Sequence, residues 1–157
     1  MTEGTRWQFT GLIVLLVALH FILRIGLQLG FLAPDLRVVA LLLAARRMRP
    51  GTASGLGLLL GLLDGAAQPF AMGASAVVLC VLGYLASRSR EFLASDNPVT
   101  LLAYLALGKW LFDALLWGLL ATRGHAPSAA TLVVAAAAAI YAGLVGLAAA
   151  TAYRVVT

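Results

Sequence analysis

Two residues of opposite charge, Lys109 and Asp113, stand four positions apart inside a long apolar run. In a helix this spacing puts both side chains on one face, where they can form an ion pair. A charge inside a lipid bilayer is costly unless it meets an opposite charge or a polar interior. The pattern therefore favours an internal ion pair that fixes helix packing. A proton or ion pathway is the alternative, but relays usually need several carboxylates at this depth, and the run supplies only Asp113.

A second polar stripe lies in the first apolar run, where His20, Arg24 and Gln28 recur every four residues. This stripe is expected to face the bundle and the outer surface, with the Arg24 side chain extending to the lipid headgroups. A polar packing contact is the simpler interpretation of His20. The functional alternative is a histidine that titrates near neutral pH.

A glycine seam occupies the third apolar run, where Gly57, Gly61 and Gly65 repeat every four residues. Small residues at this spacing let two helix backbones approach closely. The seam predicts either close packing within the protein or a docking groove for the transmembrane helix of a partner. Asp64 ends the same run and is expected at the outer surface, where it caps a helix or contacts a partner's basic group. All four residues are candidates for partner binding.

Catalytic chemistry has little support in this sequence. It offers no Ser/His/Asp set, no paired carboxylates at depth, no metal-ligand spacing of Cys and His, and no phosphate-binding loop. The single cysteine, Cys80, lies inside an apolar run and is expected to be a small packing side chain. We therefore predict a protein that is not an enzyme and that has no catalytic residues, cofactor or metal.

The composition indicates the class of protein. Of the 157 residues, 62% are hydrophobic and 11% are charged, and the mean hydropathy is +1.00. A soluble domain of this size needs more polar surface, so the chain is predicted to be an all-α integral membrane protein with a single domain. The formal net charge is +5. Its basic residues lie between apolar runs, which indicates topology signals and lipid headgroup contacts and excludes nucleic acid.

Six apolar runs predict about six transmembrane helices in one bundle. The predicted spans are residues 11–31, 34–48, 52–64, 70–86, 99–121 and 128–153. A helix over residues 34–48 would be about 22 Å long, whereas the hydrocarbon core is about 30 Å thick. Whether the second and third runs each cross the bilayer completely therefore stays open.

Basic residues predict the orientation. With the N-terminus inside and alternating spans, the cytoplasmic side receives more arginines than the outer side, which supports both termini in the cytoplasm. The cytoplasmic set is Arg6, Arg46, Arg47, Arg49, Arg88, Arg90 and Arg154, against Arg37, Arg123 and the nearby Arg24 outside. The groups at 46–49 and 88–90 are interpreted mainly as topology signals. Binding to cytoplasmic proteins or anionic lipids is their second interpretation.

Residues 34–92 resemble a known family. The segment has Pro34-Asp35-Leu36, an apolar helix, and then RRMRPG at 46–51. It continues with GLGLLLGLLDG at 55–65, a polar hinge with Pro69, and LGYL at 82–85 before Arg88 and Arg90. This pattern is similar to that of the rod shape-determining protein MreD family. The remainder of the chain is similar in hydropathy and span count.

The resemblance implies a non-enzymatic subunit of the bacterial cell-wall elongation machinery in the inner membrane. The expected partner is MreC, which has one transmembrane span and a large periplasmic domain. The actin-like MreB and the RodA–penicillin-binding-protein synthase are further expected associates. Partner contact would lie at the Gly57, Gly61 and Gly65 seam and at Asp64, and the Gly83-Tyr84 pair would lie near the cytoplasmic side.

One alternative function is the substrate-binding membrane component of an energy-coupling-factor vitamin transporter, which is also a six-span, glycine-rich protein. That function requires ordered outer loops with polar and aromatic groups. The predicted outer loops at 32–35, 64–69 and 122–127 are short and poor in such groups, so the scaffold function is favoured.

Overall fold

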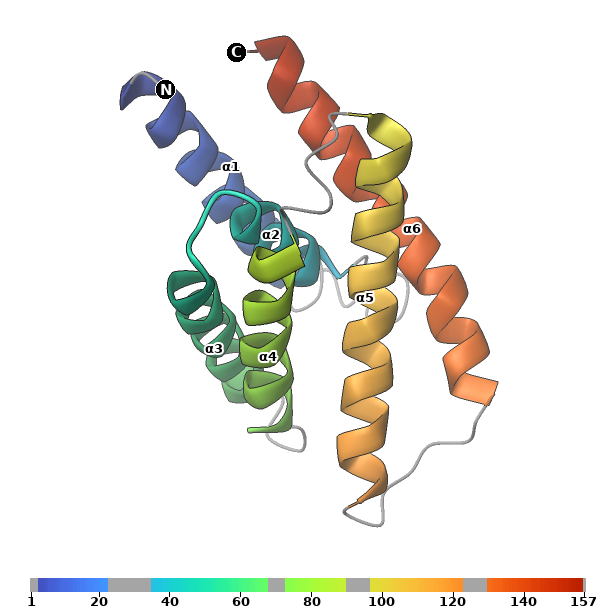
Figure 1. Cartoon of the computed structure of the whole chain (residues 1–157). Coiled ribbons are helices and arrows are strands. Elements are labelled where there is room, and N and C mark those ends of the chain that lie inside the picture. Colours follow the sequence, from blue (N-terminus) through green and yellow to red (C-terminus); the bar gives the residue numbers. More distant parts are fainter. Residues whose placement is uncertain (1–2, 23–34, 68–72, 90–96, 123–129, 157) are drawn as a thin grey trace.

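The computed structural model describes residues 3–22, 35–67, 73–89, 97–122 and 130–156. Within these ranges the regular secondary structure is entirely helical, as the composition predicts (Figure 1). The helices are α1 (Glu3–Phe21), α2 (Leu36–Ala45), α3 (Pro50–Ala67), α4 (Ala74–Arg88), α5 (Pro98–Ala121) and α6 (Ala130–Val156). Parts of the first, second, fourth and sixth predicted spans lie outside the described residues.

Among the described residues, two helices have the length and composition to cross a membrane: α5 over its whole length, Pro98–Ala121, and α6 over Val133–Ala152. Only 28% of the most apolar part of α5 and 22% of that of α6 are buried inside the chain. The core helix of a soluble protein would be mostly buried, so these exposed apolar surfaces point to a lipid surrounding. The structure therefore supports association with a membrane.

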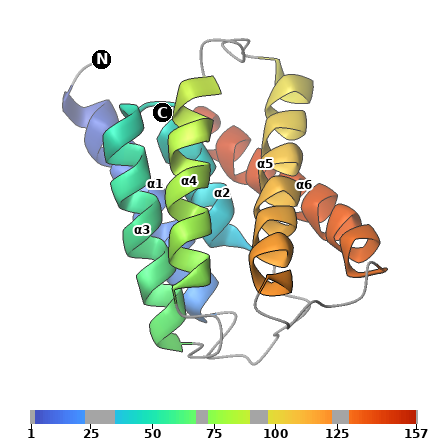
Figure 2. The ribbon, with the colours of Figure 1, turned by 60° about the horizontal axis from the view of Figure 1, so that its bottom comes forward.

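Helix α2 forms the centre of the bundle. All ten of its residues are buried, and α1, α3, α4, α5 and α6 each contact it (Figures 1 and 2). Ten residues give a helix about 15 Å long, which is half of the hydrocarbon thickness. The helix that forms in the second predicted span is therefore too short to cross a bilayer by its own length.

The outer helices form two antiparallel pairs (Figures 1 and 2). Helix α3 packs along α4, and α5 packs along α6, and these are the most extensive helix contacts of the described residues. Helix α6 approaches its neighbours closely because glycines face them. A Cβ atom on Gly146 would lie 2.7 Å from a methyl group of Val39 in α2, and one on Gly143 would lie 3.1 Å from a methyl group of Leu102 in α5.

Hydrogen bonds join the C-terminal ends of α2 and α4. The Ser87 hydroxyl donates to the Met48 carbonyl oxygen at 2.7 Å. The Tyr104 hydroxyl of α5 lies 3.0 Å from the Leu42 carbonyl oxygen and 3.5 Å from that of Ala86. The start of α1 and the end of α6 lie at this same end of the bundle (Figures 1 and 2). The turn at 46–49 and the end of α4 at Arg88 are therefore neighbours.

Candidate functional site

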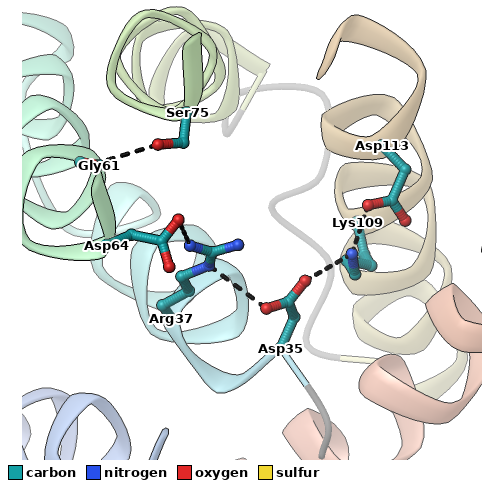
Figure 3. Close-up of polar contacts among 7 residues, drawn as sticks. All are labelled: Asp35, Arg37, Gly61, Asp64, Ser75, Lys109 and Asp113. Atoms are coloured by element: carbon teal, nitrogen blue, oxygen red, sulfur yellow. Dashed lines mark hydrogen bonds and ion pairs between the residues drawn. The ribbon is translucent and has the colours of Figure 1, made fainter. Parts of the chain in front are cut away.

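Five charged side chains from three helices meet inside the bundle (Figure 3). Arg37 of α2 forms ion pairs with Asp64 of α3 and, at 3.3 Å, with Asp35. Lys109 of α5 has its Nζ 2.7 Å from Asp35 Oδ2 and 2.5 Å from Asp113 Oδ1. We call these residues the ionic network; they are linked in the order Asp64, Arg37, Asp35, Lys109 and Asp113.

The network forms around the N-terminus of α2. Asp35 is the N-cap residue, and its carbonyl oxygen accepts hydrogen bonds from the backbone N–H groups of Val38 and Val39 at 3.1 and 3.3 Å. The positive end of the helix dipole lies here, so it favours a carboxylate such as that of Asp35. Pro34 precedes Asp35 in the sequence, and its ring disfavours a helix that continues through this point from the preceding run.

The Phe112 ring lies against both cations of the network. Its centroid is 5.4 Å from the Arg37 guanidinium carbon and 5.1 Å from Lys109 Nζ. Phe112 is fully buried, so this contact combines apolar packing with cation–π attraction. The ring and the Asp35 carboxylate together hold two like charges close to each other at the centre of the bundle.

Burial differs along the network. The side chains of Arg37 and Asp64 are each 5% exposed and that of Lys109 is 7% exposed, whereas Asp35 and Asp113 are 15% and 20% exposed. Removing charges from water is costly, and pairing offsets much of that cost only when the geometry is good. Such a network adds little stability over an apolar core. It does fix the relative positions of the helices, since a displaced helix would leave a buried charge unpaired.

The structure contains the Lys109–Asp113 ion pair that the spacing indicates, and it extends the pair to Asp35, Arg37 and Asp64. No spacing in the sequence connects these three residues with the pair, although their charges within apolar surroundings are a usable signal. His20 is buried, with 1% of its surface exposed, and its ring makes an edge contact with Phe21 at 5.5 Å. Arg24 lies outside the described residues.

The glycine seam is occupied by α4. A Cβ atom on Gly57 would collide with the Leu79 carbonyl oxygen, and one on Gly61 would collide with the Ala76 Cα atom. The Ser75 hydroxyl also donates a hydrogen bond to the Gly61 carbonyl oxygen at 3.2 Å. The seam is therefore a contact within the protein, and these two glycines leave no room for a partner helix.

The other residues proposed for partner contact are also enclosed. Gly65 is buried, and Asp64 is buried in its ion pair with Arg37 instead of lying at the outer surface. Of the two interpretations of this segment, the packing therefore favours a close contact within the protein over an open docking groove. Gly83 of α4, which the sequence analysis placed near the cytoplasmic side, packs against the Ala53 carbonyl oxygen of α3 and completes the same interface.

The basic residues have a different environment. Arg47, Arg49 and Arg88 are exposed and Arg46 is half-buried, all near the end where α2 and α4 finish. Arg90 lies outside the described residues. This end of the bundle is therefore positively charged, and its groups can reach lipid headgroups or acidic protein surfaces.

Within the described ranges no three His, Cys, Asp or Glu side chains are grouped so that they could hold a metal ion. No family model, curated protein or solved structure matches the chain. Its function is therefore argued from its own residues and from the pattern at 34–92.

Proposed function

We propose that the protein is a non-enzymatic, multi-pass scaffold subunit of the bacterial cell-wall elongation complex. In this proposal it lies in the inner membrane with both termini in the cytoplasm and binds the transmembrane helix of the single-span protein MreC. The observation that carries the proposal is that Asp and Gly residues of the MreD-like pattern, far apart in the sequence, pack α2, α3 and α4 against one another.

The two acidic positions of the pattern share one partner. Asp35, before the second helix, and Asp64, at the end of the glycine-rich helix, both form ion pairs with Arg37, which stands where the resemblance implies an apolar residue. The glycines of the pattern serve the same unit, since Gly57 and Gly61 admit the backbone of α4 and Gly83 admits that of α3. These Asp and Gly residues of the pattern therefore share one structural role, the packing of α2, α3 and α4, and this shared role supports the proposal.

The charge distribution supports the proposed orientation. The exposed residues Arg47, Arg49 and Arg88 lie at one end of the bundle, together with the start of α1 and the end of α6 (Figures 1 and 2). Cytoplasmic surfaces of membrane proteins carry such an excess of basic residues. This end would face MreB and the cytoplasmic parts of the RodA–penicillin-binding-protein synthase.

The partner surface must lie on the outward faces of the helices, because the glycine seam is filled. Outward apolar side chains that suit a partner helix include Leu107 and Trp110 of α5, with 66% and 42% of their surfaces exposed. Helix association in lipid depends on close packing and on hydrogen bonds between helices. A scaffold with a preformed interior and apolar outward faces meets that requirement.

Co-purification tests the proposal. The tagged protein would be expressed with MreC from the same bacterium, extracted in mild detergent and recovered on the tag. We expect MreC to be retained, and retained equally by a variant of MreC that lacks its periplasmic domain. If neither form of MreC is retained, while saturable vitamin binding raises the melting temperature of the protein, the transporter function replaces this one.

A further inference from the structure

Asp113 carries a charge that the ionic network does not require. With His20, which also acts electrostatically on Asp35, counted as neutral, Arg37 and Lys109 supply two positive charges, and Asp35 and Asp64 supply two negative charges that contact them directly. Asp113 adds a third carboxylate through Lys109. Because Lys109 also has Asp35 at 2.7 Å, it would keep an ion pair if Asp113 were absent. Internal pairing therefore accounts for the other four residues of the network better than it accounts for Asp113.

Asp113 is also the most exposed member of the network, at 20%. One of its carboxylate oxygens faces Lys109, and Figure 3 shows the other directed away from that contact. The residue lies three positions after Trp110 on α5, so it borders the outward stripe of Ala103, Leu107 and Trp110, all of which are exposed. An excess negative charge thus lies at the boundary between the bundle and its surroundings.

We propose that Asp113 is a docking point for the transmembrane helix of a partner that carries a basic side chain at the same depth. This inference rests on the proposed scaffold function and names the chemistry of its partner. The partner helix packs on the Leu107–Trp110 stripe of α5, and its donor side chain binds the Asp113 oxygen that does not face Lys109. The network thereby becomes electrically balanced when the partner carries a positive charge.

Three physical arguments support this occupant. A carboxylate with excess charge is costly at a lipid boundary, and a donor on a neighbouring helix lowers that cost. Asp113 lies eight residues before the end of α5, about 12 Å along the helix. A lipid headgroup at that end of the helix is therefore too far away to bind its carboxylate. Trp110 beside it is of the residue type that most often dominates binding at interfaces.

Retention of MreC by variants of Asp113 tests the inference. We expect Asp113→Leu to reduce the retained MreC about tenfold, as the loss of one charge-assisted hydrogen bond predicts. Asp113→Glu is expected to keep most of the retention, and Asp113→Asn to keep less. The matched control is Tyr141→Leu on α6, where an aromatic residue is 50% exposed; it is expected to retain MreC as the wild type does.

Site-specific cross-linking keeps the test valid if Asp113→Leu fails to fold. A photoreactive amino acid at position 110 is expected to cross-link MreC, and the same group at position 141 is not. The inference is overturned if the wild type retains MreC while Asp113→Leu retains it equally, if Asp113→Asn behaves as the wild type, or if position 110 gives no cross-link. A wild type that retains no MreC would instead reject the proposed function itself.

Discussion

Lys109 Nζ lies 2.7 Å from Asp35 Oδ2, and this contact fixes the middle of α5 against the first turn of α2. At the other end of α2, the Tyr104 hydroxyl, also from α5, lies 3.0 Å from the Leu42 carbonyl oxygen. The central helix is thus held to one neighbour at both of its ends, by an ion pair and by a hydrogen bond. A translation of α5 along α2 would break both contacts and leave buried polar groups unsatisfied.

Removal of either partner of the Arg37–Asp64 ion pair should destabilise the fold strongly. Arg37→Leu leaves the buried Asp64 carboxylate without its cation, and Asp64→Leu leaves Arg37 with only Asp35. We expect a loss of about 3–5 kcal/mol for Arg37→Leu and a smaller loss for Asp64→Leu. Denaturation of the purified protein in detergent would measure both.

The double variant Arg37→Leu/Asp64→Leu is the control for that prediction. Because it removes both charges together, it should cost clearly less than the sum of the two single variants. Additive losses would mean that the two side chains contribute independently, and the pair would then have no specific role in joining α2 to α3.

Glycine substitutions on α3 should affect stability differently on the face that packs against α4 and on the face that has free space. Gly61→Leu introduces a side chain against the Ala76 backbone, and backbone cannot yield as a flexible side chain does. We expect a loss of about 1–3 kcal/mol or more from overpacking. Gly55 lies on the same helix with nothing within 4 Å of its Cβ position, so Gly55→Leu should be neutral or stabilising. Equal melting temperatures for the two variants would contradict the packing of α3 on α4.

The contacts that sequence reasoning found differ from those it missed in one respect. Lys109 and Asp113 belong to one helix, so the helical period alone brings them together. The Asp35–Lys109 contact joins residues on different helices, and no spacing encodes which helices become neighbours. The same limit applies to Gly57 and Gly61, whose spacing predicted a close helix contact without showing that α4 makes it.

The short length of α2 could be predicted from the sequence, but its complete burial could not. The apolar run in the sequence is shorter than a bilayer-spanning helix needs, and the ten-residue helix α2 is also too short to span the bilayer. The sequence could not show that every residue of α2 would be buried, including Arg37. An all-apolar stretch has the same appearance whether lipid or other helices surround it. The distinction depends on tertiary contacts.

The Tyr104 hydroxyl should contribute modestly to stability. Tyr104→Phe removes the donor to the Leu42 and Ala86 carbonyl oxygens, although Leu42 keeps the backbone N–H group of Arg46 at 3.4 Å. We expect a loss of about 1 kcal/mol. Tyr141→Phe is the matched control, because this tyrosine is half exposed on α6, and it should change the melting temperature little. A larger loss at Tyr141 than at Tyr104 would contradict the junction of α2, α4 and α5.

Cysteine labelling should place the basic end of the bundle on one side of the membrane. In a Cys80→Ala background, Arg47→Cys and Arg88→Cys lie in exposed positions at the same end, since Ser87 donates to the Met48 carbonyl oxygen between them. Both should react with a membrane-impermeant maleimide only in inside-out vesicles. Thr122→Cys, at the opposite end of α5 and about 36 Å along the helix from its start, should react only in right-side-out vesicles.

The background substitution is itself expected to be tolerated. Cys80 is a free, partly buried thiol whose sulfur lies 3.0 Å from the Ser54 hydroxyl, so alanine removes one weak contact between α3 and α4. Labelling of positions 47 and 88 from opposite sides would require α3 and α4 to cross the membrane an odd number of times between them. That result would contradict the antiparallel α3–α4 pair, and the proposed orientation and its cytoplasmic partners would be rejected with it.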